Sequence, residues 1–246
     1  MKRIIRIMMT AWLAVGARAE MRTWSPLEGD AVEGEYVSVV FDNIVLRDAD
    51  GREFKLPLHA VSEADRKYVE LANPPKLTVD LLESADQVFV KTSPIWEDNS
   101  PVTLLRHAFG ARIKQTGQGD YNHELRVEIF AVAQQVYDTS KYHLVYRWES
   151  EPFRLTAGNN RRIECRGPRS VDIAKFLLDG RYPRGQRYAE SLIVVRDERG
   201  EVVAYNTTKN WLFGNLDKLS ALPTGAWFDK TCLPVHPTSP KPVWLD

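Results

Sequence analysis

The sequence predicts a mainly β protein, with a small first domain and a larger antiparallel β-sandwich behind it. Short runs of β-branched and aromatic residues alternate with polar ones, and turn-forming residues separate the runs at close intervals. Only two segments have the pattern of a helix. Several short strands with turns at this spacing are typical of a β-sandwich, of which the immunoglobulin-like arrangement is one form.

Residues 31–58 predict three strands of the first domain. Asp42-Asn43 favours the first reversal and the DADG run at 48–51 favours the second, because Asp and Gly tolerate the left-handed conformations of tight hairpins. A helix is then expected from Glu63 towards Leu71. Its signals are a capping hydroxyl at Ser62 and a carboxylate three residues later at Asp65.

The order of these motifs is specific. Between Arg22 and Val69 the chain reads RTW, VEGEYVSV, NIVLRDADGREFKLPL and VSEADRKYV. The spaced positions that carry the pattern are Trp24, Leu46, Gly51, Ser62, Asp65 and Tyr68. Residues 22–72 therefore resemble the first homology domain of the Sla-type endocytic adaptors, a small SH3-like barrel that also occurs in bacterial exported proteins.

The resemblance implies an SH3-like barrel with a closing helix, and binding rather than catalysis. The eukaryotic members recognise short Asn-Pro-Phe-x-Asp peptides. This chain has Glu53 where the adaptors have a basic residue after the hairpin glycine, so the adaptor ligand is not carried over. A binding groove is expected near Tyr36 and Phe54.

The remainder of the chain predicts the sandwich. Strands are expected at 125–137, 142–148, 153–155, 161–165, 189–195 and 201–207. One helix is expected at Val171 to Leu178, started near Ser170 or Asp172 and stopped by Gly180. The predicted domains are a leader at 1–19, the SH3-like domain at 20–75, a linker at 76–101, the sandwich at 102–222 and a proline-rich tail at 223–246.

Residues 1–19 have the pattern of a secretory signal peptide. Basic residues precede an apolar run from Ile7 to Gly16, and Ala17-Arg18-Ala19 offers a cleavage site. The run is about half the length that a membrane-spanning helix needs. We expect an exported protein, periplasmic, secreted or at the cell surface, with no membrane span after cleavage.

The charge balance gives no indication of a nucleic-acid partner. Basic and acidic residues both number 33, and the leader removes four basic residues, which leaves a net charge of −4. A nucleic-acid binder would be expected to carry a clear basic excess.

The two cysteines, Cys165 and Cys232, allow two interpretations. In an oxidising compartment they would pair as a disulfide between the tail and the body, and otherwise they are buried free thiols. No metal site and no cofactor are expected, because neither cysteine has a second ligand at metal-binding spacing.

Local enzyme motifs are missing from the sequence. It contains no Gly-x-Ser-x-Gly elbow, no Gly-rich phosphate loop, no His-Glu-x-x-His and no Cys-x-x-Cys. We therefore expect a protein that is not an enzyme.

Candidate binding residues outside the first domain are aromatic and basic side chains. Trp96, Trp211 and Trp227 lie in loop-like stretches, where aromatic rings can stack on sugars or fill partner pockets. Arg161 and Arg162 belong to an arginine-rich run that either grips an anion or forms a solvated strand edge. The sequence thus predicts a binding or scaffold protein for a protein or peptide partner, with a carbohydrate-binding accessory protein for envelope polysaccharide as the alternative.

Overall fold

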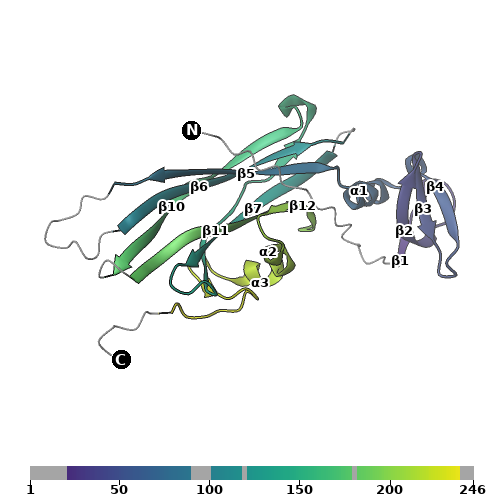
Figure 1. The fold of residues 1–246 in the computed structure, drawn as a ribbon. Helices are drawn as coiled ribbons and strands as arrows, with labels where there is room; N and C mark the ends of the chain where they lie inside the picture. Colours follow the sequence, from purple (N-terminus) through teal and green to yellow (C-terminus); the bar gives the residue numbers. More distant parts are fainter. Residues whose placement is uncertain (1–20, 90–100, 118–120, 179–181, 239–246) are drawn as a thin grey trace. The chain divides into compact units, whose positions relative to one another are not determined.

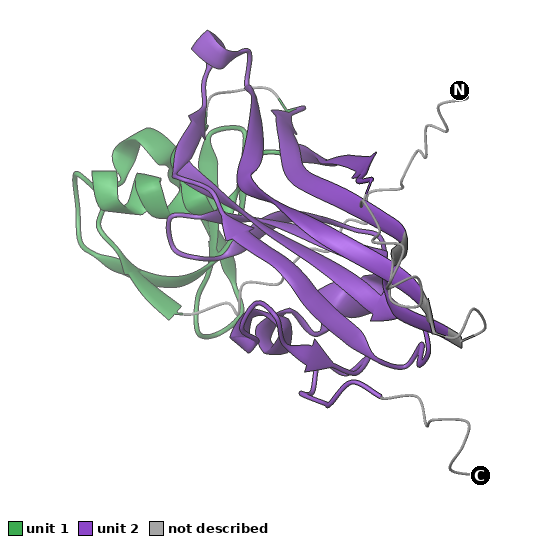
Figure 2. Cartoon of the chain, turned by 90° about the vertical axis from the view of Figure 1, so that its left-hand side faces the viewer, with its two compact units in different colours: residues 1–76, 117–123 green, residues 77–116, 124–246 purple. Residues whose placement is uncertain are grey.

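The computed structural model describes residues 21–89, 101–117, 121–178 and 182–238. The chain divides into two compact units (Figure 2), Met1–Lys76 with Gly117–His123, and Leu77–Thr116 with Glu124–Asp246. Both units are built mainly from antiparallel strands, labelled as in Figure 1. The mainly β fold class that the sequence predicts is therefore confirmed.

Unit 1 contains a four-stranded antiparallel sheet in the order β1-β2-β3-β4. Its strands are β1 (Met21–Trp24), β2 (Val32–Val40), β3 (Asn43–Arg47) and β4 (Glu53–Pro57). The three strands predicted over 31–58 are present. The first reversal differs, since Phe41 and Asp42 form the turn and Asn43 already belongs to β3.

Helix α1 (Glu63–Ala72) closes the sheet, after the short 3-10 helix η1 (Leu58–Ala60). The predicted cap is confirmed, because the Ser62 hydroxyl accepts a hydrogen bond from the Asp65 backbone N–H. The Asp65 carboxylate in turn accepts from the Ser62 hydroxyl at 2.8 Å, from the Ser25 backbone at 2.8 Å and from Arg22 at 2.6 Å. This buried carboxylate therefore ties the segment after β1 to the start of the helix.

Asp65 should make unit 1 sensitive to acid. Burial alone would raise the pKa of Asp65, but hydrogen bonds from Ser25, Ser62 and Arg22 outweigh it and hold the pKa below its ordinary value. The ionised carboxylate therefore stabilises the fold above the unfolded-state pKa of about 4, and this contribution is lost as the pH falls through the lower folded-state pKa. In urea titrations between neutral pH and pH 3, Asp65→Asn should remove that part of the pH dependence. An unchanged acid profile in Asp65→Asn would contradict the assignment.

The core of unit 1 is centred on Trp24. Its ring is fully buried, its Nε1 donates to the Gly34 carbonyl at 2.9 Å, and Tyr68 meets it edge-on at 5.7 Å between ring centroids. Ile44, Leu46, Val61 and Val69 complete the buried cluster. An isolated bridge between Pro26 and Val61 joins the chain after β1 to the residue before the helix cap.

Unit 2 contains a curled antiparallel sheet that includes nine strands of the described part of the chain. The main path is β13-β8-β7-β11-β10-β6-β5, with β12 paired to β11 and β9 to β7. The bounds are β5 (Leu77–Gln87), β6 (Pro101–Gln115), β7 (Tyr121–Gln135), β8 (Tyr142–Glu149), β9 (Phe153–Leu155), β10 (Arg162–Leu178), β11 (Tyr182–Asp197), β12 (Val202–Thr207) and β13 (Trp227–Phe228).

The sheet folds over on itself into a sandwich-like arrangement. Strands β10 and β11 pair only where Lys175–Leu178 meets residues 182–185, so the strands on either side of this seam diverge into two layers (Figure 1). The layers meet again at the other edge, where the Asn206 side chain of β12 donates to the Val79 carbonyl of β5 at 2.6 Å. The two layers thus belong to one continuous path, unlike the separate sheets of an immunoglobulin domain.

Two short helices cover the outer face of the β7–β11 layer. They are α2 (Asn210–Gly214) and α3 (Leu216–Ala221). The buried cluster beneath them includes Phe130 and Val132 of β7, Leu192 of β11 and Leu219 of α3. Alternate residues of β7 are buried as well, so this strand is covered on both faces.

Three sequence predictions are wrong in this region. The linker predicted at 76–101 contains β5, in which Leu77 and Val79 are buried against β6. The helix predicted at 171–178 is the end of β10, where residues 171–176 pair with β6 and residues 175–178 pair with β11. Part of the predicted tail at 223–246 is also ordered sheet, because β13 pairs with β8. In each case a partner strand far away in the sequence decides the conformation.

Candidate functional site

The tip of the β2–β3 hairpin combines exposure with an unfavourable backbone. Val40 pairs with Asn43, so Phe41 and Asp42 form a two-residue loop, with φ values of 48° and 58°. Positive φ at both central positions defines a type I′ turn, for which Asn and Gly are strongly preferred. Residue Phe41 is 93% exposed, and the adjoining Val40 is 39% exposed.

The turn is held in this conformation from both sides. The Asn43 side-chain amide donates to the Phe41 carbonyl at 2.8 Å, and the Leu58 backbone N–H donates to the Asp42 carbonyl at 2.8 Å. A bulky residue in the left-handed region is uncommon and costs roughly 1–2 kcal/mol. Phe41 is exposed, so burial of its ring does not offset this backbone cost. A strained and exposed aromatic residue on a fixed turn is a candidate contact residue.

Tyr36 and Phe54 do not form the exposed groove that the sequence predicts. Both are partly buried and pack against the core around Trp24. The Asn73 side-chain amide donates a hydrogen bond to the Tyr36 hydroxyl. Burial raises the pKa of Tyr36 more strongly than this hydrogen bond lowers it. They contribute to the stability of unit 1 rather than to an open surface.

The tryptophan candidates are also packed. Trp211 belongs to α2, not to a loop, and lies 4.9 Å from Tyr142 between ring centroids. Trp227 belongs to β13 and stacks on His143 at 4.6 Å with an interplanar angle of 3°. Both are half-buried, and Trp96 lies outside the described residues. Trp211 and Trp227 thus pack against neighbouring rings of unit 2 instead of projecting as free anchors.

Part of the arginine run is paired with one acidic residue, Glu164. Arg162 and Arg112 both donate to the Glu164 carboxylate at 2.8 Å, and these two contacts lower the pKa of Glu164. Arg161 has a left-handed backbone, and its carbonyl accepts from the Gln115 N–H at 2.9 Å. Along Arg162 to Arg166 the strand is paired with β6, so this stretch is a charged outer face rather than an anion grip.

The disulfide alternative for the cysteines is wrong, because both thiols are free and buried. Cys165 lies on β10 opposite Ala111, whereas Cys232 belongs to the core beneath α2 and α3, which does not include Cys165. Burial raises the pKa of Cys165, and it raises the pKa of Cys232 to about 11. Neither thiol is therefore set up as a nucleophile.

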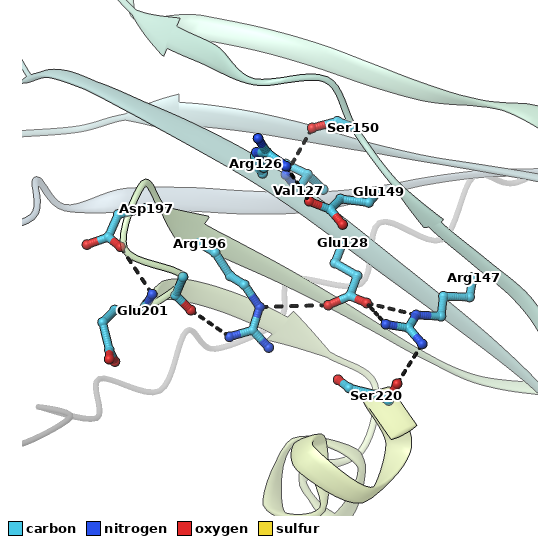
Figure 3. Close-up of polar contacts among 11 residues, drawn as sticks. Arg126, Val127, Glu128, Arg147, Glu149, Ser150, Arg196, Asp197, Glu201 and Ser220 are labelled. Atoms are coloured by element: carbon cyan, nitrogen blue, oxygen red, sulfur yellow. Dashed lines mark hydrogen bonds and ion pairs between the residues drawn. The ribbon is translucent and has the colours of Figure 1, made fainter. Parts of the chain in front are cut away.

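A second cluster of charged residues lies on the sheet of unit 2 (Figure 3). The Glu128 side chain is 9% exposed and pairs with Arg147 at 2.8 Å and Arg196 at 3.8 Å. Arg147 also donates to the Ser220 carbonyl of α3 at 2.6 Å. The two arginines satisfy the hydrogen-bonding capacity of the Glu128 carboxylate, and Arg147 connects the sheet to helix α3. We call Glu128, Arg147 and Arg196 the clamp, and its role is structural.

Replacing Glu128 with Gln should destabilise unit 2. The neutral amide loses the charge-assisted bonds to Arg147, at an expected cost of about 1–2 kcal/mol in the free energy of unfolding, moderated by the partial exposure of both arginines. Glu149→Gln is the matched control, because its pair with Arg126 is more than half exposed. Chemical denaturation compares the two variants, and equal effects would argue against the clamp.

The described residues show neither a membrane-spanning helix nor a metal-binding cluster. None of the helices there is long and apolar enough to cross a membrane. In the same ranges, no three His, Cys, Asp or Glu side chains are grouped in a way that would hold a metal ion.

Comparison with known proteins leaves the family open. No family model matches the sequence, and no curated protein matches it. A crystal structure of a protein from Akkermansia muciniphila is 12% identical over 55% of this chain and 70% of that chain, with a TM-score of 0.22. A likeness at this level supports no argument about fold or function.

Proposed function

We propose that this chain is an exported, non-catalytic binding protein of the cell envelope that recognises a protein or peptide through the β2–β3 hairpin of unit 1. The observation that carries the proposal is Phe41, an aromatic residue that is 93% exposed on a turn whose backbone conformation is unfavourable for it. Folding stability does not account for such a residue, because Asn or Gly would be better there. Exposed aromatic anchors do account for binding energy at interfaces.

Protein recognition has more support than carbohydrate recognition. A carbohydrate site built on exposed tryptophans would need rings that are free to stack on sugars. Trp211 and Trp227 are instead half-buried against Tyr142 and His143. The hairpin offers one projecting ring with an apolar neighbour, which fits insertion into a pocket of a partner.

The cell-envelope location rests on the leader pattern of residues 1–19. An N-terminal sequencing measurement on the protein recovered from the producing cells would test it. Mature chains that begin near Glu20 are the expected result.

A capture experiment tests the recognition element. The full mature chain, its Phe41→Asn variant and its Leu27→Asn variant would each be immobilised and exposed to envelope extract. Leu27 is the matched control, because it is an apolar residue of unit 1 that is 65% exposed but lies outside the hairpin. A defined protein held by the unmodified chain and by Leu27→Asn, and lost with Phe41→Asn, is the expected outcome. Retention by all three chains would contradict the proposal.

A further inference from the structure

A site at the end of β7 holds Thr238, the last residue of the C-terminal strap, which we define as residues 233–238. Gln135 ends β7, and its side-chain amide donates to the Thr238 carbonyl at 2.5 Å and accepts from the Thr238 N–H at 3.1 Å. Asp138 follows in the next turn, and its Oδ2 accepts from the Thr238 hydroxyl at 2.6 Å. Three hydrogen bonds thus converge on one residue that is at least 100 positions away in the sequence.

The two side chains that bind Thr238 are held in place by contacts outside the strap. Gln135 is 8% exposed, and its backbone N–H donates to the Lys141 carbonyl at 3.0 Å. The backbone and the hydroxyl of Ser140 donate to Oδ1 of Asp138 at 3.0 and 2.6 Å, which leaves Oδ2 for the strap. Groups whose positions are already fixed bind a ligand at a lower entropic cost, so the site is preorganised.

These contacts define the chemistry of the ligand. A carboxamide that pairs with both the N–H and the C=O of one residue recognises the backbone, as a neighbouring strand would. The carboxylate only accepts hydrogen bonds, and a hydroxyl close to the backbone is the donor that it meets here. The site is therefore suited to an extended peptide with serine or threonine at the bound position.

The strap buries little apolar surface. Leu233 is 52% exposed, and His236 and Pro237 are exposed as well. The hydrophobic core beneath α2 and α3 already ends at Cys232, which is 2% exposed and directly precedes the strap. Segments with few buried apolar contacts and solvent-accessible hydrogen bonds open locally at a small fraction of the free energy of global unfolding. The strap can therefore leave the site while the core stays folded.

We propose that Gln135 and Asp138 form a recognition site for an extended peptide with a serine or threonine residue, and that the chain's own strap occupies it as a displaceable ligand. Pro234 and Pro237 favour this occupancy, because proline limits the strap to extended conformations and so lowers the entropic cost of binding. A second peptide of the same chemistry competes with the strap for the site. The site belongs to unit 2 and does not depend on the function proposed for the hairpin.

Amide hydrogen exchange in the full mature chain measures how firmly the strap is held. Thr238→Val removes the hydroxyl but keeps the backbone and the shape of the side chain. Exchange of the N–H at position 238, corrected for its intrinsic rate, should become about tenfold faster. Thr231→Val is the matched control, because the Thr231 hydroxyl makes an equivalent bond of 2.6 Å to Asp229 within its own turn. It should leave exchange at position 238 unchanged.

A synthetic peptide tests the same site in trans. The peptide acetyl-Leu-Pro-Val-His-Pro-Thr-amide has the sequence of the strap. The receiving chain is the full mature Thr238→Pro variant, whose own strap lacks both the N–H and the hydroxyl that the site binds. Binding is followed through the NMR signal of the Gln135 side-chain amide, which is expected to shift in a saturable way. A peptide with valine in place of threonine should bind about tenfold more weakly.

The unmodified chain shows whether the strap competes for the site. It should bind the threonine peptide about tenfold more weakly than Thr238→Pro does, because its own strap is present at a high effective concentration. Equal exchange at position 238 in Thr238→Val and Thr231→Val would overturn the proposal. So would a Gln135 signal that the threonine peptide leaves unchanged, equal affinity for the two peptides, or equal binding to the unmodified chain and to Thr238→Pro.

Discussion

Replacing Phe41 with Asn is expected to stabilise unit 1 and, at the same time, to abolish recognition of its partner. Phe41 has a φ of 48°, in the left-handed region where Asn is one of the few favourable residues. The residue is 93% exposed, so the substitution removes almost no buried contact. We expect a gain of about 0.5–1 kcal/mol in the free energy of unfolding, measured by urea denaturation.

Partner affinity should change in the opposite direction. An exposed aromatic anchor that inserts into a pocket is worth about 2 kcal/mol or more, so the dissociation constant should rise by roughly 30-fold or more. Leu27→Asn should leave both stability and affinity nearly unchanged. A Phe41→Asn variant that loses stability, or that keeps its affinity, would show that Phe41 serves the fold.

Replacing Trp24 with Ala is expected to have the largest effect on stability. The ring is fully buried, its Nε1 donates to the Gly34 carbonyl, and the Arg22 guanidinium lies 5.3 Å from its centroid. Removing a buried tryptophan costs about 3–5 kcal/mol, which is a large part of the stability of a small domain. Unit 1 should unfold at markedly lower urea concentration than in the unmodified chain.

Trp24→Phe separates packing from hydrogen bonding in this prediction. It keeps most of the buried area but leaves the Gly34 carbonyl without its donor, so a smaller loss of about 1–2 kcal/mol is expected. Tryptophan fluorescence alone would be ambiguous, so far-ultraviolet circular dichroism should follow the transition. An Ala variant as stable as the Phe variant would contradict the central position of Trp24.

Local signals explain the elements that the sequence predicts correctly. The turn at 48–51 and the cap at Ser62 depend on residues within a few positions of each other, and both occur as expected. The strands predicted at 189–195 and 201–207 likewise form the hairpin of β11 and β12, which turns at 197–200. Local backbone preferences and short-range hydrogen bonds from side chains such as Asp48 and Ser62 decide such features.

Long-range pairing explains the errors. Residues 77–87 form a strand because they pair with residues 105–115 of β6. Residues 171–176 are part of strand β10 because they also pair with β6. The residues within each segment do not indicate that a distant strand will pair with it. Helix α2 could not be predicted for the same reason, because it is stabilised by packing on the sheet face beneath it. Trp211 was therefore expected in a loop.

Phe41 could not be identified as a contact residue because the predicted position of the turn is wrong by one residue. The sequence places the reversal at Asp42-Asn43, and the observed loop is one residue earlier, at Phe41 and Asp42. Asn43 instead pairs across the strands with Val40 and donates its side-chain amide to the Phe41 carbonyl. An aromatic residue directly before an Asp-Asn pair at the end of a strand is the signal that would have indicated an exposed ring.

Site-specific photocrosslinking tests most directly whether the β2–β3 hairpin is the recognition element. A benzophenone side chain would replace Phe41 in one version of the full chain and Leu27 in another, and both would be irradiated in the producing cells. The account predicts that the probe at position 41 is crosslinked to one defined envelope protein and that the probe at position 27 is not. Crosslinks to that protein from position 27 alone, or identical products from both positions, would contradict it.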